Sequence, residues 1–457
     1  MKKFFEYVAM AAMMIVGVGC APKEEVAQSR LVVLDPGHFH ASLLQKNELP
    51  AFAPTVAVYA PEGAELEQYI GFVEGYNSRE NNPTHWVLDT YAGEDYLDRM
   101  VAEHKGDVVV LAGNNRKKTQ YIYAAVEAGY NVLADKPMAI STDDYTLLKE
   151  AYALAAEKGV VIYEMMTERY DVKNILEKKI LANEALFGTL TQGTPEEPAV
   201  YQESVHHFCK MVSGKPSVRP AWYYDVEQQG EGIVDVTTHL VDLVQCTVKP
   251  EQEIDYQNDI KFTSARRWAT KISRDKYRLV TGKEDYPAFL QKDIVNDTLH
   301  VYSNGEMNYQ LDGVNCRVSV VWNFMAEVGT EGTGDTHYSV VKGTKSNIEI
   351  RQGAEQGYKP MLYVVNKGSD ADAFEATLRA SLKSIEKQYP GLDIRKVSGN
   401  EWQVVIPSAV VKTHEMRFSS VMKVYLDYLK QGEIPAWERS HLKSKYYTTT
   451  KAFELAR

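Results

Sequence analysis

Short apolar runs alternate with helical patterns over the first third of the chain. The apolar runs have the length of strands and lie at 31–34, 56–59, 107–112, 131–134 and 160–165. Helical patterns at 93–104, 118–128 and 141–158 separate several of them. Nearly continuous apolar strands with intervening helices are typical of a parallel sheet covered on both faces. We therefore expect residues 31–165 to form a doubly wound parallel sheet of the α/β class.

The pattern changes after residue 166. Helical segments are predicted at 170–182, 371–388, 411–430 and 436–455, and strands at 298–303, 306–311, 317–322, 338–342, 347–351, 362–366 and 402–406. Asn304-Gly305 lies between two of these strands and predicts a two-residue hairpin turn. Residues 188–229 are expected to be rich in loops. Residues 166–457 are thus predicted to form an α+β domain with a large open, mostly antiparallel sheet.

The first twenty residues have the pattern of an export signal. Lys2 and Lys3 precede an apolar stretch, 8–19, that is too short to span a membrane. Gly17-Val18-Gly19-Cys20 resembles a bacterial lipoprotein signal, in which Cys20 becomes lipidated. We expect 1–20 to be a signal peptide and 21–30 a tether. The mature protein would then be exported and anchored by lipid on the periplasmic or cell-surface side. An ordinary signal peptide is the alternative and also implies export.

Composition narrows the classes of partner. The chain has 457 residues, enough for two or three domains, and a net charge of −11. This charge argues against nucleic acid, which requires a basic face. Besides Cys20, the cysteines are Cys209, Cys246 and Cys316, without CxxC spacing. They indicate neither a disulfide framework nor a zinc site.

The turn after the first predicted strand has features of a dinucleotide site. A strand, a glycine turn and a helix place backbone N–H groups where a pyrophosphate binds. Gly37 keeps the second glycine of GxGxxG, whereas Asp35 and His40 replace the first and third. His38, Phe39 and His40 are expected to face the cofactor; a metal-binding histidine pair is the alternative, and no metal is expected. The acid that contacts ribose in NAD enzymes is missing or displaced to Glu62, so NAD and NADP both stay open.

Two later strand ends add candidates. Asn114 and Asn115 follow the strand at 107–112 and are candidate cofactor contacts, with 116–118 as a solvated helix start. Asp135-Lys136-Pro137 ends the strand at 131–134. A lysine at the carboxyl end of a buried parallel strand points into the ligand crevice. A lysine in a surface turn is the simpler alternative.

A histidine and an aspartate four residues apart form the next candidate. Asp235 and His239 are predicted to share one face of a helix that glycines precede. Histidine titrates near neutral pH, and a nearby carboxylate favours its charged form. The chain before this helix offers four candidate sugar contacts, which are His206, His207, Trp222 and Tyr223.

Taken together, these motifs resemble the Gfo/Idh/MocA oxidoreductases. Asp135-Lys136-Pro137 is similar to the family's E-K-P, with Asp for Glu. Residues 232–242 are similar to its glycine-rich D-x-G-x-H-x-x-D helix, with Thr237 for the glycine. The turn DPGHFHA at 35–41 resembles the corresponding turn in a secreted or lipoprotein branch of this family. The resemblance covers about 31–350, so 352–410 is expected to be an insertion that is atypical of the family.

The resemblance implies a Rossmann dinucleotide-binding domain at 31–165 and an NAD(P)-dependent oxidoreductase. Lys136 would bridge nicotinamide and substrate hydroxyl, His239 would be the acid/base, and Asp235 would hold substrate or tune both. We expect hydride transfer to or from a hydroxyl-bearing carbon of a sugar, polyol or sugar derivative. Two alternatives stay open: redox-assisted glycoside cleavage with tightly bound NAD, and a non-catalytic lipid-anchored carbohydrate-binding protein. Homo-oligomers through the exposed sheet face occur in the family.

Overall fold

The computed structural model describes residues 28–212, 215–326 and 334–457. The predicted signal peptide, Cys20 and most of the tether lie outside the described residues. No helix in the described ranges is long and apolar enough to cross a membrane.

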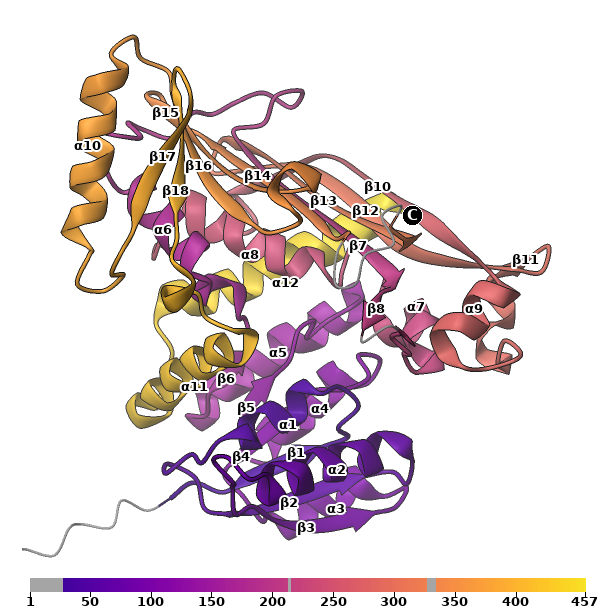
Figure 1. Cartoon of the computed structure of the whole chain (residues 1–457). Helices are drawn as coiled ribbons and strands as arrows, with labels where there is room; N and C mark the ends of the chain where they lie inside the picture. The colour runs from indigo at the N-terminus through magenta and orange to yellow at the C-terminus, as the bar shows by residue number, and fades with distance from the viewer. Residues whose placement is uncertain (1–27, 213–214, 327–333) are drawn as a thin grey trace, which may run out of the picture.

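The N-terminal part is a six-stranded parallel sheet in the order β3-β2-β1-β4-β5-β6, as the apolar runs predict (Figure 1). Its strands are β1 (Leu31–Leu34), β2 (Thr55–Ala60), β3 (Val87–Ala92), β4 (Val108–Leu111), β5 (Asn131–Ala134) and β6 (Ile162–Glu164). Its helices are α1 (His40–Leu43), α2 (Ala64–Ser78), α3 (Tyr96–Glu103), α4 (Lys118–Glu127) and α5 (Thr142–Lys158). This strand order is that of a Rossmann domain, and it reverses between β1 and β4.

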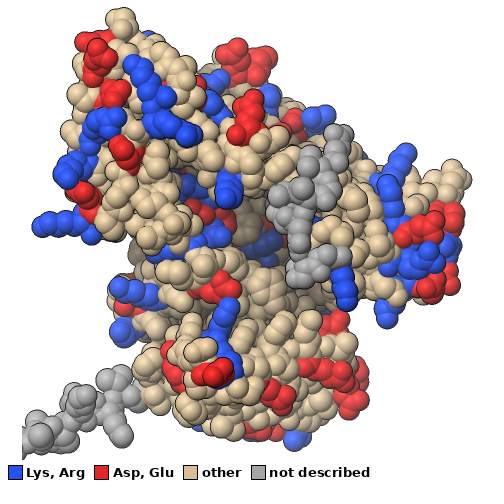
Figure 2. All heavy atoms as spheres, viewed as in Figure 1, with Lys and Arg blue, Asp and Glu red and all other residues tan. Residues whose placement is uncertain are grey.

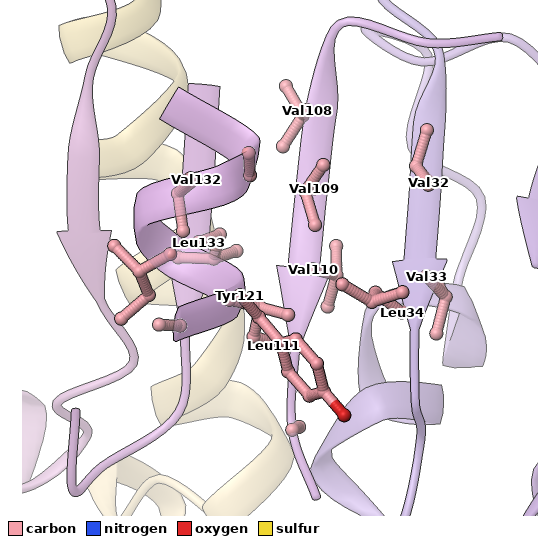
Figure 3. Packing of buried hydrophobic residues seen from close by; sticks show 14 of the residues in the cluster. Val32, Val33, Leu34, Val108, Val109, Val110, Leu111, Tyr121, Val132 and Leu133 are labelled. Atoms are coloured by element: carbon pink, nitrogen blue, oxygen red, sulfur yellow. The ribbon is translucent and has the colours of Figure 1, made fainter. Parts of the chain in front are cut away.

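The central strands are apolar throughout because both faces of the sheet are covered. Figure 3 shows valines and leucines of β1, β4 and β5 packing side by side, with Tyr121 of α4 beside them. β3 was not predicted, because this edge strand leaves Val87, Asp89 and Thr90 exposed and so has no apolar run.

The C-terminal part is a ten-stranded sheet in the order β10-β12-β13-β7-β14-β15-β16-β18-β17, with β11 beside β12. Its strands are β7 (Val200–Cys209), β10 (Ile260–Ser273), β11 (Ile294–Val295), β12 (Thr298–Leu311), β13 (Val314–Met325), β14 (Thr336–Lys342), β15 (Ser346–Gln352), β16 (Met361–Asn366), β17 (Asp393–Ser398) and β18 (Glu401–Val405). β8 (Met211–Val212) and β9 (Lys215–Pro216) pair separately. Among the described strands of the large sheet, only β7 and β13 run parallel, so the predicted mostly antiparallel sheet is confirmed.

Helices lie mainly on one face of this sheet (Figure 1). The helices of this part are α6 (Val172–Leu181), α7 (Val226–Gln229), α8 (Thr237–Val248), α9 (Arg274–Thr281), α10 (Ala371–Ser384), α11 (His414–Gln431) and α12 (Ala436–Ala456). Of these, α11 packs against the Rossmann sheet instead. Between β15 and α11, residues 352–410 supply α10 and β16–β18, which extend the sheet to its far edge.

Two predictions in this part were wrong. The stretch expected to be loop-rich contains β7, a central strand whose alternating polar residues hide it from a search for apolar runs. Asn304-Gly305 is not a turn but lies inside β12, where the Asn304 amide donates to Trp268 O (3.0 Å). The turn between β12 and β13 is Asp312-Gly313, and both residues have positive φ angles (50° and 79°), as a two-residue hairpin requires.

The last two helices join the two sheets. Phe418, Tyr425 and Leu442 of α11 and α12 belong to the hydrophobic core of the Rossmann sheet. Figure 1 shows α11 beside β6 and α12 running from the Rossmann helices to the large sheet. The C-terminal segment is therefore part of both cores.

Candidate active site

A cavity of about 510 Å³ opens at the carboxyl ends of β1, β2 and β4. Figure 2 shows the surface hollowed between the two parts of the molecule, with basic side chains inside the hollow. The cavity is lined by Asp35, Pro36, Gly37, Ala60, Pro61, Glu62, Gly63, Glu65, Leu66, Glu94, Tyr96, Asn114, Arg116, Lys117, Trp222 and Gln228. It lies where the strand order reverses, which is the ligand-binding crevice of open α/β sheets.

The backbone around this cavity suits a dinucleotide. Gly113 leaves room for the turn after β1, because a Cβ there would lie 2.4 Å from the carbonyl oxygen of Asp35. Asp35 adopts a positive φ of 48°, which a glycine usually supplies, and Tyr121 donates to its carboxylate (2.8 Å). Burial raises the pKa of the Asp35 carboxyl. Glu62, the displaced acid, lies in the lining and can meet a ribose.

The basic residues beside the cavity differ partly from the prediction. Arg116 and Lys117 are exposed, as expected for a solvated helix start, but they also line the cavity. Lys118 is buried, with Nζ 2.5 Å from Asn115 Oδ1 and 3.1 Å from Asp135 O, so the solvated assignment was wrong for this residue. Asn115 is also buried, and its amide donates to Gln229 O (2.7 Å) instead of facing the cavity.

The lysine that ends β5 pairs with the aspartate before α8. Lys136 Nζ lies 2.7 Å from Asp235 Oδ1, and the Gln229 amide donates to Asp235 Oδ2 (2.9 Å). The Lys136–Pro137 peptide bond is cis. Burial opposes the charge of Lys136, but the carboxylates of Asp235 and Asp135 outweigh it and raise its pKa. Burial likewise opposes the charge of Asp235, but the ammonium of Lys136 outweighs burial and lowers the pKa of Asp235. The pair is therefore ionised.

His239 lies in the first turn of α8, while Asp235 lies in the turn that precedes this helix. The two residues therefore do not share a helix face. His239 Nδ1 is 3.0 Å from the sulfur of Met166. Burial and then the charge of Lys136 lower the pKa of His239 to about 4, against the effect of nearby carboxylates. As expected, the nearby carboxylate of Asp235 favours the charged form of this histidine, but burial and Lys136 outweigh it. The expected titration near neutral pH was therefore wrong, and His239 is neutral at pH 7.

Three of the predicted cofactor residues form a cluster outside the cavity lining. His40 Nδ1 and His38 Nδ1 lie 3.0 Å and 3.3 Å from the same oxygen of Asp135. Phe39 is exposed and its ring lies against both imidazoles. His414 of α11 completes the cluster, with its Nε2 2.9 Å from His40 Nε2.

The predicted sugar contacts divide between two places. Trp222 donates to Glu65 (3.0 Å) and lines the cofactor cavity, and it thereby links the two parts of the chain. Tyr223 packs under Arg219, whose guanidinium is 4.4 Å from the ring centroid. His206 and His207 lie on β7 and approach Asp335 at 3.4 Å and 3.0 Å.

Glu168 and Asp335 were not found from the sequence. Glu168 follows β6 and pairs with Arg417 (2.9 Å), and Lys173 and Arg417 outweigh burial and lower its pKa to about 2. Its position after the end of a parallel strand is a signal that could have been used. Asp335 has no comparable signal, because it meets β7 only through the pairing of β14 with that strand.

Two family models match this chain. The "Oxidoreductase family, NAD-binding Rossmann fold" matches residues 36–165. The "Putative oxidoreductase C terminal domain" matches residues 176–457. A crystal structure of a "putative oxidoreductase" from Parabacteroides merdae ATCC 43184 is 48% identical, with a TM-score of 0.91, over 94% of this chain and 97% of that chain. No curated protein matches.

Two more distant structures share the fold. One is a 3-ketoreductase from Actinomadura kijaniata in complex with TDP-benzene and NADP, with 11% identity, a TM-score of 0.54, and coverage of 93% of this chain and 96% of that chain. The other is a biliverdin reductase from Synechocystis sp. PCC 6803 in complex with biliverdin and NADP+, with 11% identity, a TM-score of 0.54, and coverage of 93% and 98%.

Proposed function

The chain belongs to the oxidoreductase family with an NAD-binding Rossmann fold, and from this premise we propose its reaction. It transfers hydride between NAD(P) and a hydroxyl-bearing carbon of a sugar, polyol or sugar derivative. The observation that carries this proposal is the ionised Lys136–Asp235 pair (2.7 Å) beside the neutral His239.

The protonation states assign the roles. Lys136 keeps its proton and can donate a hydrogen bond to the substrate oxygen. His239 is neutral and can accept the hydroxyl proton as the general base. Its Nδ1 faces the Met166 sulfur, so Nε2 is left for the substrate. Asp235 holds Lys136 in place and charged.

The cavity beside β1, β2 and β4 would hold the cofactor. Gly37 and Asn114 would lie along it, and Glu62 would approach the ribose of the adenosine half. When bound, NAD(P) supplies the hydride acceptor or donor. Arg116 and Lys117 add positive charge to a lining that also contains Glu62, Glu65 and Glu94, so NAD and NADP are both candidates.

Aromatic rings support a sugar as substrate. Tyr223, Trp322 and His206 pack together near the ion pair, and the charges of Lys136 and Asp235 act on the Tyr223 hydroxyl. Such rings cover the apolar face of a sugar, while Tyr and Trp also offer a donor. A 3-ketoreductase of similar fold was solved with TDP-benzene and NADP, which agrees with a small-molecule substrate.

The first experiment is mass spectrometry of the nucleotide released when the purified protein is denatured. Stoichiometric NAD(H) or NADP(H) identifies the cofactor and favours self-recycling chemistry, such as redox-assisted glycoside cleavage. Sugars deuterated at single carbons then show which C–H bond delivers hydride to that nucleotide. Absence of nucleotide, together with no thermal shift on adding either one, would contradict the redox proposal. A carbohydrate-binding protein would then be the better explanation.

Location and assembly are part of the proposal. We infer export and lipidation at Cys20, because the residues before it match a lipoprotein signal. Cys20→Ser should move the protein from the membrane fraction to the soluble fraction, and retention in the membrane would contradict this inference.

We also infer self-association through the solvent side of the large sheet, where β10 alternates exposed and half-buried residues. Sedimentation of the purified chain tests this, and a monomer at micromolar concentration would contradict it.

A further inference from the structure

A compact group of metal-binding side chains lies beside the catalytic lysine. His38 and His40 come from the turn after β1, and Asp135 comes from the end of β5. One ligand atom from each residue lies within 4.8 Å of the other two. The chain thus brings two imidazoles and one carboxylate from two segments 95 residues apart to a single point.

Two imidazole nitrogens converge on one carboxylate oxygen. Asp135 Oδ2 lies 3.0 Å from His40 Nδ1 and 3.3 Å from His38 Nδ1. The backbone N–H of His40 also lies 3.4 Å from His38 Nδ1. A cation between the imidazoles and the carboxylate would accept lone pairs from all three groups.

We propose that His38, His40 and Asp135 bind a divalent first-row transition metal ion, for which Zn²⁺ is the first candidate. Zinc bonds to histidine nitrogen and carboxylate oxygen are about 2.0–2.1 Å, so neighbouring ligands in a tetrahedron lie about 3.3 Å apart. The distances from Asp135 Oδ2 to His40 Nδ1 and His38 Nδ1 are 3.0 Å and 3.3 Å. This revises the expectation that the protein holds no metal.

The surroundings suit a metal site with an open position. Three protein ligands leave the fourth position of zinc free, as in catalytic sites. The His38 side chain is 40% exposed and offers a route for entry, whereas Asp135 is buried. His414 Nε2 lies 2.9 Å from His40 Nε2 and can accept its proton, which would orient His40 towards the metal.

A second His–His–Asp group provides a matched control. His206 and His207 approach Asp335 at 3.4 Å and 3.0 Å, much as His38 and His40 approach Asp135. There, however, Lys210 Nζ lies 2.5 Å from Asp335 and already neutralises the carboxylate. The ammonium would repel a metal ion, so this group should bind none.

The test is titration of the full-length protein, stripped with a chelator, with Zn²⁺ and with Co²⁺. Calorimetry should show one equivalent of Zn²⁺ bound, and Co²⁺ should give the visible absorption of a nitrogen-ligated ion. We expect His40→Gln to weaken binding by at least about 100-fold and His207→Gln to leave it unchanged. His38→Gln changes an exposed side chain and serves as a second variant if His40→Gln unfolds.

No binding at micromolar metal, or equal binding by wild type and His38→Gln, would overturn the proposal. Equal losses in His38→Gln and His207→Gln would also overturn it. The readout is binding, not activity, so its outcome is independent of the proposed reaction. Nucleotide content, measured on the same samples by mass spectrometry, shows whether the cofactor cavity stays intact in each variant.

Discussion

The charge of Lys136 depends most on the carboxylate of Asp235, and Asp135 is a second contributor. Asp235 is buried, lies 2.7 Å from Lys136 Nζ, and also receives the amide of Gln229. A buried cation that loses its partner becomes easier to deprotonate, because burial disfavours its charged form. The pair therefore controls whether Lys136 can donate to a substrate oxygen.

Asp235→Asn should lower kcat/KM by at least about 100-fold, because the amide cannot hold Lys136 charged or place its ammonium. Steady-state kinetics with the substrate found by the deuterium screen is the measurement. Asp89→Asn is the control, since Asp89 also pairs with a lysine (Lys105 Nζ, 2.7 Å) but lies on the surface. If both variants keep wild-type kcat/KM, the ion pair has no part in the reaction.

The pKa of His239 predicts a pH profile. In the folded protein this pKa is about 4, whereas an unfolded histidine titrates near 6.5. The base is therefore neutral above pH 4, and kcat/KM for alcohol oxidation should rise through this pH and not near 6.5. The measurement is kcat/KM for alcohol oxidation against pH. A rise centred near pH 6.5 would show that His239 is not the base or is not shielded from water.

The same pKa predicts the sign of a stability effect. Between pH 6.5 and 4 the unfolded chain binds more protons at this position than the folded chain, so stability should fall as the pH is lowered through this window. Urea unfolding at pH 7 and pH 5 should show a smaller loss for His239→Gln than for wild type. His337 and His441, whose pKa values are also lowered to about 4, add to the loss in both proteins. Equal losses in the two proteins would contradict this prediction.

The sequence can locate a site residue when a local motif marks it. Lys136, Asp235 and His239 stand in local motifs, and the structure brings Lys136 and Asp235 into contact. Glu168 is marked by its place after a strand end, but its partner Arg417, like the partners of Asp335, comes from a distant segment that spacing along the chain cannot reveal. The same holds for Lys118, whose buried ammonium donates to the carbonyl oxygen of Asp135 in the turn after β5.

Two glycines allow the turn before α8 to lie against β12. A Cβ on Gly232 would come 1.7 Å from Ser303 O, and a Cβ on Gly305 would come 2.5 Å from the Cβ of Ile233. These contacts fix the turn that carries Asp235 onto the sheet. They also explain the presence of Gly305 in the middle of a strand, because glycine in strands often marks a close backbone approach.

Gly232→Ala should destabilise the protein by about 1–3 kcal/mol or more, because the added methyl forces the turn away from β12. Activity should fall as well, since Asp235 moves with the turn. Gly75→Ala in α2 is the control: in the part of the chain that the structure describes, a Cβ added there meets nothing within 4 Å, and the change should stabilise the helix by about 0.5–1 kcal/mol. Urea unfolding measures both. A Gly232→Ala protein as stable as wild type would show that this contact does not hold the turn.

The elements differ in how well the sequence predicts them, for a physical reason. Strands of the Rossmann sheet are buried on both faces, so β1 and β4 read as plain apolar runs. Strands of the large sheet have one solvated face, so β7 is half polar and was taken for a loop. The buried Asn304 of β12 donates its amide to Trp268 O and to Thr270 Oγ1 of β10. The interior of this strand therefore contains an asparagine before a glycine, which resembles the sequence of a hairpin turn.

The two sheets of the molecule are joined by a buried charge cluster. Lys445 of α12 is fully buried and contacts both Glu164 at the end of β6 and Asp242 of α8 (3.0 Å). Arg169 also pairs with Asp242, and Tyr446 donates to Glu164. These links tie β6 of the Rossmann sheet to α8, the helix that carries His239.

Lys445→Met should destabilise the protein by about 3–5 kcal/mol, because two buried carboxylates lose their shared cation. Lys451→Met on the same helix is the control, since Lys451 pairs with Glu454 at the surface and its loss should cost less than about 1 kcal/mol. Urea unfolding, followed by both tryptophan fluorescence and circular dichroism, measures these costs. Because α12 belongs to both cores, the wild-type probes should coincide in one transition. In Lys445→Met they should separate as the two sheets lose their connection. If Lys445→Met unfolds with coincident transitions and loses no more stability than Lys451→Met, then apolar packing alone joins the two parts.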